Sequence, residues 1–197
     1  MLGVTLGIRH AADPDHVTAI AALVARHRRP AVAAGIGAAW GLGHSLVIFA
    51  VGGALVALHV TAVPAWARAA ELAVAAILVA LGISNFRSLR VRPIDEPIGG
   101  GPIARAPTLR SVAIGMAHGL AGSAAVALLA LAAMPSPSAA IAYLAAFGLG
   151  TLVSMVAMSL GLGLPVSLAG RRPALARWLV AGSGGLSIGV GIYLAVA

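Results

Sequence analysis

The sequence has no cysteine and no lysine, and it is poor in charged and aromatic residues. Without cysteine, disulfides, thiolate metal sites and thiol redox relays are excluded. Charged residues occupy 9% of the 197 positions, against about 25% in soluble domains. Hydrophobic residues make up 60%, and the mean hydropathy is +1.02. Such a chain has too few polar side chains to cover a surface in water, which predicts a membrane protein.

The formal net charge is +8, and all 13 basic residues are arginine. Most of these arginines lie between apolar stretches instead of forming one face with interleaved aromatic residues. That distribution is typical of the cytoplasmic loops of membrane proteins. We therefore expect the chain to sit in a lipid bilayer and exclude nucleic acid as a partner.

Six apolar stretches are long enough to cross a bilayer, which takes about 20 helical residues. They lie near residues 2–25, 31–58, 66–86, 110–133, 138–164 and 174–196. Polar or proline-containing breaks separate them. We predict an all-α, polytopic membrane protein with six transmembrane helices.

The arginines are distributed unequally between the two predicted sides of the membrane. Eleven of the 13 fall in or beside the breaks after the first, third and fifth stretches, whereas Arg68 falls on the other side. Because cytoplasmic loops are enriched in arginine, this predicts a multi-pass protein of the cytoplasmic membrane with both termini outside. The longest break, residues 87–109, holds four prolines and a run of three glycines. We expect it to be a flexible cytoplasmic loop.

Three short motifs recur in the second half of the sequence at offsets of 107 to 109 residues. They pair Leu6–Ala11 with Ile114–Gly119, Ala39–Gly43 with Ala146–Gly150, and Leu81–Ile83 with Val190–Ile192. Three spans per half would invert one half relative to the other, a common plan in transporters. We predict two inverted three-helix repeats, residues 1–86 and 110–197. The alternative is a chance alignment of helices rich in alanine, glycine and leucine.

The first apolar stretch contains the segment His10-Ala11-Ala12-Asp13-Pro14-Asp15-His16. Charged side chains inside a membrane are usually tied to a transported ion, a proton path or each other. Imidazole suits nickel, cobalt, copper, zinc or iron, and carboxylates add charge compensation. We therefore predict that His10, Asp13, Asp15 and His16 bind a metal ion.

Pro14 determines the local geometry of this segment. Proline breaks a helix from within but is favoured at the first helical position, and Asp13 before it is a good N-cap residue. We predict a helix break near Asp13–Pro14. On an unbroken helix, His10 and His16 would be about 9 Å apart along the axis and could not share one ion. Irregular backbone is tolerated at membrane depth where it lines a cavity.

Two other interpretations of the segment stay open from the residues alone. The four polar side chains could form a cap near the outer membrane surface, although a cap needs only one or two. His10 and Asp15 also have the His-x4-Asp spacing that some acyltransferases use as a catalytic pair. We find no sign of a nucleotide or acyl-carrier site, and we predict that the protein is not an enzyme.

Further polar residues lie within the other stretches. His44, in Gly43-His44-Ser45, is near the middle of the second stretch and predicts a polar cavity there. His118 is the repeat partner of His10, and Thr151 occupies the place of His44 in the second half. Each of these could instead be satisfied by ordinary helix packing. The candidates for lining a translocation path are His118, Ser123, Thr151, Ser84 and Asn85.

The segment His10–His16 resembles the signature of the nickel/cobalt transporter family, H-A-x-D-x-D-H in a transmembrane helix. Gly43-His44-Ser45 is similar to that family's second motif. His118-Gly119-Leu120-Ala121-Gly122-Ser123 is closer to the short, urease-accessory-type nickel permeases and to their relatives in the larger exporter superfamily. The longer members have about eight spans with the signature in the second, and their acidic motif in the second half is missing here.

The resemblance implies a divalent transition-metal permease. We expect it to move Ni²⁺, and also Co²⁺, across the cytoplasmic membrane in the direction of uptake. The ion is the substrate, no resident cofactor is expected, and His10, Asp13, Asp15, His16 and His44 would bind it. A cytoplasmic nickel chaperone or urease-maturation protein is a candidate partner of the loop at 87–109. The alternatives are efflux of the same ions through the same fold, and an anion or sulfite exporter, which the acidic first stretch argues against.

Overall fold

The computed structural model describes residues 2–58, 66–91, 106–121, 134–169 and 172–197, and over these residues the chain is all-helical. The helices are α1 (Leu2–Ala11), α2 (Pro14–Val24), α3 (Pro30–Ala57), α4 (Ala67–Val91), α5 (Ala106–Leu120), α7 (Pro137–Leu168) and α8 (Pro173–Val196). Four of them, α3, α4, α7 and α8, are long and apolar enough to cross a membrane. They coincide with four of the six predicted spans, and the protein is a helical membrane protein.

The helices described within the other two predicted spans are shorter. Residues 2–25 form α1 and α2, which are 10 and 11 residues long. The predicted span at 110–133 begins within the 15-residue helix α5, and residues 122–133, Ser123 among them, lie outside the described part of the chain. Over the described residues, an unbroken helix long enough to span is therefore found for four of the six predicted stretches.

The helix break at Asp13–Pro14 lies where the sequence predicts it. α1 ends at Ala11, and α2 begins with Pro14 at its first position and with Asp13 in extended conformation before it. The Asp13 side chain makes no capping hydrogen bond to α2. Its carboxylate binds the imidazole of His10 instead, so the proline alone determines where α2 begins.

Helix α4 is longer than the third predicted span. It continues through Arg87 and Arg90 to Val91, beyond the predicted end at residue 86. Arginine is a good helix former, and the first helix breaker after the span is Pro93, so nothing ends the helix earlier. α5 begins at Ala106. Residues 92–105, which include most of the loop proposed to bind a chaperone, lie outside the described residues.

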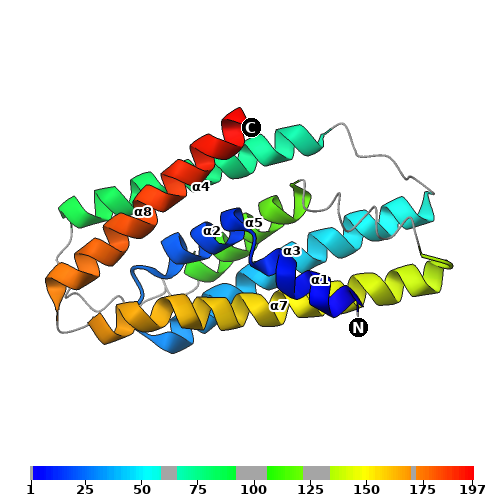
Figure 1. Ribbon diagram of the computed structural model, residues 1–197, viewed down its shortest axis with the longest axis horizontal. Coiled ribbons are helices and arrows are strands. Elements are labelled where there is room, and N and C mark those ends of the chain that lie inside the picture. Colours follow the sequence, from blue (N-terminus) through cyan, green and yellow to red (C-terminus); the bar gives the residue numbers. More distant parts are fainter. Residues whose placement is uncertain (1, 59–65, 92–105, 122–133, 170–171) are drawn as a thin grey trace.

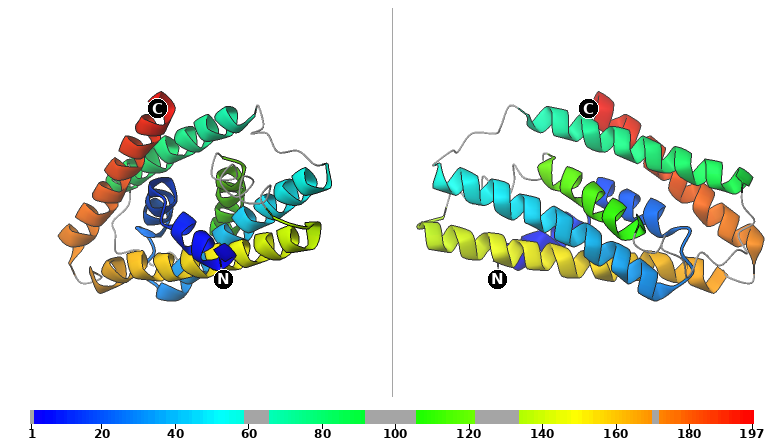
Figure 2. Two further views of the ribbon diagram at one scale, coloured as in Figure 1. Left: turned by 45° about the vertical axis from the view of Figure 1, so that its right-hand side comes forward. Right: turned by 180° about the vertical axis from the view of Figure 1, so that it is seen from behind.

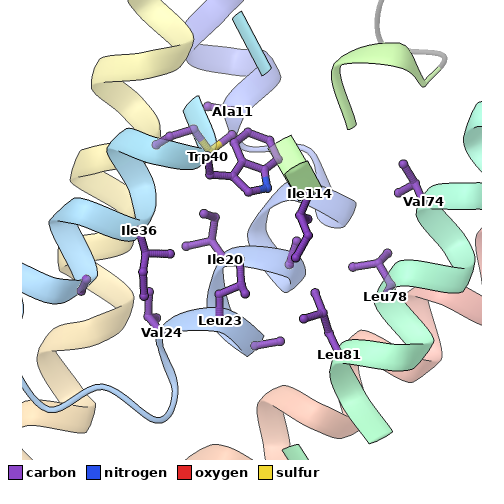
Figure 3. Packing of buried hydrophobic residues seen from close by; sticks show 14 of the residues in the cluster. Ala11, Ile20, Leu23, Val24, Ile36, Trp40, Val74, Leu78, Leu81 and Ile114 are labelled. Atoms are coloured by element: carbon purple, nitrogen blue, oxygen red, sulfur yellow. The ribbon is translucent and has the colours of Figure 1, made fainter. Parts of the chain in front are cut away.

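The helices are arranged as a bundle in which α3 packs against α5 and α7, α1 packs against α7, and α4 packs against α8 (Figure 1). The short helix α2 contacts α7 and α8 from within the bundle, as two further views also show (Figure 2). The buried apolar core lies beside α2, where Ile20 and Leu23 meet Ile36 and Trp40 of α3 and Leu78 of α4 (Figure 3).

Eight of the ten described arginines gather at one end of the bundle, on the left in Figure 1. The ends of α2 and α4 and the starts of α3, α5 and α8 meet there and carry Arg26, Arg28, Arg29, Arg87, Arg90, Arg110, Arg172 and Arg177. Burial and the nearby charge of Arg26 lower the pKa of His27 at this end. Arg68 lies at the opposite end, where its guanidinium donates to the carbonyls of Leu194 and Ala195 at 3.3 and 3.2 Å.

Glycines allow the short helices to approach the long ones closely. A Cβ on Gly7 of α1 would collide with the carbonyl oxygen of Phe147 on α7. A Cβ on Gly115 of α5 would collide with the carbonyl oxygen of Trp40 on α3 in the same way. Small residues at such contacts let helix backbones touch in membranes. These two contacts position the helix ends that carry His10 and His118.

Candidate metal-ion site

Four histidines from four helices meet in the interior of the bundle. His10 is at the end of α1, His16 is in the first turn of α2, and His44 and His118 lie on α3 and α5. His10 is 8% exposed and the other three are 0% exposed. The ring centre of His16 is 4.5 Å from that of His10, 5.1 Å from that of His44 and 5.5 Å from that of His118.

His10, His16 and His44 form a compact group of nitrogen ligands. One ring nitrogen from each lies within 4.8 Å of the others. The Nε2 atoms of His10 and His44 are 3.0 Å apart, a distance at which one ring can donate a hydrogen bond to the other or both can bind one ion. The Nδ1 atom of His10 is 2.8 Å from Oδ2 of Asp13. A carboxylate in this place orients a histidine so that its other nitrogen faces a metal.

The two carboxylates form a second group with His16. Asp13, Asp15 and His16 each offer one ligand atom within 4.8 Å of the others. The Oδ1 atom of Asp15 is 3.3 Å from Nδ1 of His16. The Asp13 side chain is 48% exposed and that of Asp15 is 19% exposed. This group therefore lies at the edge of the buried histidines, on their more accessible side.

Neither ring nitrogen of His16 has an aligned hydrogen-bond partner among the described residues. The contact between His16 and Asp15 is short enough for an ion pair but is not aligned as a hydrogen bond. Buried polar atoms are normally hydrogen-bonded. Free imidazole nitrogens in a buried cluster are thus available to bind a metal ion.

Two aromatic side chains enclose the histidines, and the sequence reasoning did not assign either to the site. Trp40 is fully buried, stacks on His44 with ring centres 4.9 Å apart, and contacts the edge of His16 at 5.0 Å. The ring of Phe147 lies 5.4 Å from that of His10. Trp40 precedes His44 by four residues, so both lie on one helix face. That spacing is the signal that could have identified Trp40.

The remaining predicted path residues differ in their relation to the cluster. His118 belongs to it, and its Nδ1 is 2.9 Å from the carbonyl oxygen of Ile114. Thr151 is buried on α7 and donates to the Phe147 carbonyl at 3.0 Å. Asn85 is buried beside α2, where its Nδ2 donates to the Ala22 carbonyl at 3.1 Å and lies 3.2 Å from the Ser183 hydroxyl. Ser84 is half-buried on α4.

The fold and the site define a helical membrane protein that has a cluster of histidines buried between its helices and two carboxylates at the edge of that cluster. The urease accessory protein UreH of Bacillus sp. (strain TB-90) is 30% identical to this chain over 202 residues, which cover 98% of the chain and 88% of that protein. The chain therefore belongs to the UreH family of urease accessory proteins, which confirms the resemblance to the urease-accessory-type branch of the nickel/cobalt transporter family. No family model and no solved structure matches the chain.

Proposed function

We propose that this protein is a secondary transporter that carries Ni²⁺, with Co²⁺ as a second substrate, across the cytoplasmic membrane in the direction of uptake. The observation that carries the proposal is the buried group of His10, His16 and His44 beside Asp13 and Asp15. Three imidazoles and two carboxylates match the ligands that first-row divalent metals prefer. The name of the UreH relative, a urease accessory protein, agrees with a role in supplying metal to an enzyme.

The distance between two histidine nitrogens is compatible with binding of one ion. Two nitrogens bound to one ion at about 2.1 Å are about 3.0 Å apart at a right angle and about 3.4 Å apart at a tetrahedral angle. The Nε2 atoms of His10 and His44 are 3.0 Å apart. The proposal of nickel rests on the ligand types, which suit first-row divalent metals, and on the likeness to a urease accessory protein.

The proposed topology places the site near the middle of the bilayer. We assign the arginine-rich end of the bundle to the cytoplasm, which puts both termini outside. Helix α1 has 10 residues and is about 15 Å long, so its break lies about halfway through a core of about 30 Å. A carboxylate at that depth that is 48% exposed, as Asp13 is, needs a water-filled path. Asp13 is thus where an ion would arrive.

The proposed inverted repeat is supported by helix contacts that occur in equivalent pairs. In each pair, a glycine of the first half lies against a backbone carbonyl of the second half. The equivalent glycine of the second half, 107 to 109 residues later, lies against the equivalent carbonyl of the first half. The pairs are Gly7 on Phe147 with Gly115 on Trp40, Gly150 on Val4 with Gly43 on Val112, and Gly82 on Gly184 with Gly191 on Ala75. A chance alignment would not reproduce the same contacts in both halves.

The decisive experiment measures accumulation of radioactive nickel in cells that lack their own nickel transporters. We compare the wild type with His16→Ala and with His27→Ala, a control that removes a histidine outside the site. Uptake by the wild type and the control but not by His16→Ala supports the proposal. Accumulation below the empty-vector level would identify an exporter that uses the same site. Equal values for all strains would contradict nickel transport in either direction.

A further inference from the structure

We propose that the site holds an ion at two alternative positions that share His16, an inference that rests on the proposed function. The outer position consists of Asp13, Asp15 and Nδ1 of His16. The inner position consists of His10, His44 and Nε2 of His16. The ion passes from one to the other around the His16 ring, and only one position is occupied at a time.

The two groups of ligands differ in burial and overlap in a single residue. Asp13, Asp15 and His16 form one set of three ligand atoms within 4.8 Å, and His10, His16 and His44 form the other. The histidines of the inner set are at most 8% exposed, whereas the Asp13 side chain is 48% exposed. An ion coming from the accessible side therefore meets the carboxylates before it meets the three imidazoles.

His16 is the residue through which the positions are connected. Its Nδ1 is 3.3 Å from the Asp15 carboxylate, and neither of its ring nitrogens has an aligned hydrogen bond among the described residues. The two nitrogens of an imidazole point in divergent directions, and in the neutral ring only one carries a free lone pair. A neutral His16 therefore binds an ion on one side or on the other. This makes the positions alternative instead of simultaneous.

The ligand types of the two positions suit two successive steps. Carboxylate oxygens accept hydrated divalent ions broadly, Mg²⁺ and Ca²⁺ included. Three imidazoles retain transition metals and disfavour those harder ions. When the ion moves inward, Asp13 is free to bind Nδ1 of His10 at the observed 2.8 Å and hold that ring toward the ion. Capture and selection are thereby separated within one site.

The test counts the imidazoles around bound nickel by X-ray absorption on the purified full-length protein in lipid nanodiscs. The wild type should bind one Ni²⁺ with three imidazoles. Removing His44 should destroy the inner position and leave the ion with the carboxylates and His16. The imidazole count of His44→Ala should therefore fall from three to one, although only one histidine is removed. A single site would lose one imidazole and keep two.

Companion variants separate the proposal from effects on folding. His10→Ala should show the same fall to one imidazole. The double variant Asp13→Asn with Asp15→Asn should keep three imidazoles and bind nickel about 10- to 100-fold more weakly, because the rings lose their orienting partners. Glu71→Gln, which removes a carboxylate of the surface pair with Arg68, should match the wild type in imidazole count and affinity.

Three results would overturn the two-position arrangement. The first is two imidazoles around nickel in His44→Ala or His10→Ala, and the second is two nickel ions bound at once to the wild type. The third is a loss of all binding in both single variants that still elute as folded proteins, because it contradicts an outer position. Absence of any nickel binding by the folded wild type would instead overturn the proposed function, so the two failures are distinguishable.

Discussion

The two halves of this protein share helix contacts but differ in chemistry. α1 packs on α7 through Gly7 as α5 packs on α3 through Gly115. Yet all five acidic residues lie in the first 96 positions, and the place of His44 in the first half is taken by Thr151 in the second. His118, the counterpart of His10, joins the cluster built by the first half. The helix contacts are thus alike in the two halves, whereas the acidic residues and three of the four clustered histidines lie in the first.

The largest expected effect comes from alanine substitutions at His44 and Thr151, which occupy equivalent positions in the two halves. His44→Ala removes a ligand of the proposed inner position and should lower nickel transport by about 100-fold or more. Thr151→Ala removes a hydroxyl that contacts the carbonyls of Phe147 on α7 and Gly7 on α1 and should cost about 1 kcal/mol of stability without loss of nickel binding. Nickel uptake by whole cells and thermal unfolding of the purified variants measure both. Equal loss of transport in the two variants would contradict a one-sided site.

The close glycine contacts should show the opposite behaviour, because both halves use them alike. Gly7→Ala and Gly115→Ala each place a methyl group on a backbone carbonyl, which should destabilise the protein by about 1–3 kcal/mol. Gly35→Ala and Gly161→Ala are matched controls, since a Cβ at either position meets no other atom within 4 Å. The controls should be neutral or slightly stabilising because alanine favours helix. Thermal unfolding in detergent compares the stability of the four variants. A large difference in stability between Gly7→Ala and Gly115→Ala would contradict equivalent packing in the two halves.

The contrast between packing and chemistry also explains how far the sequence could predict this structure. The break at Asp13–Pro14 follows from local backbone chemistry, and the four spanning helices among the described residues follow from hydropathy, so both could be predicted from the sequence. The distance between His10 and His44 could not, since it depends on how α1 and α3 pack together. Trp40 was missed because a tryptophan in an apolar helix is usually core. The length of α4 was underestimated because hydropathy marks the membrane boundary and not the helix end.

The aromatic side chains beside the histidines offer a smaller, graded test of the same asymmetry. Trp40 contacts the rings of His16, His44 and His118, whereas its counterpart Phe147 contacts His10. Trp40→Leu frees three rings to rotate and should lower nickel affinity by about 10-fold. Phe147→Leu should lower it less. Trp40→Phe keeps an aromatic face and should be intermediate, as nickel titration of the purified proteins would show. Equal affinities for Trp40→Leu and Phe147→Leu would contradict this ranking.

The smallest expected effect on transport is that of substituting Asn85. This substitution tests whether Asn85 lines the translocation path or only stabilises the packing of the helices. Its side chain joins α2 to α8 by donating to the Ala22 carbonyl and contacting the Ser183 hydroxyl. These contacts lie on α2 beyond His16, toward the arginine-rich end. Asn85→Ala should cost about 1–2 kcal/mol through the lost hydrogen bonds and leave nickel affinity unchanged. Ser187→Ala, which removes a buried bond from α8 to the Leu78 carbonyl, should show a similar loss and serves as the control. A loss of transport in Asn85→Ala at wild-type stability, with no loss in Ser187→Ala, would contradict this expectation. Asn85 would then line the path, and an ion leaving the histidine cluster would pass between α2, α4 and α8.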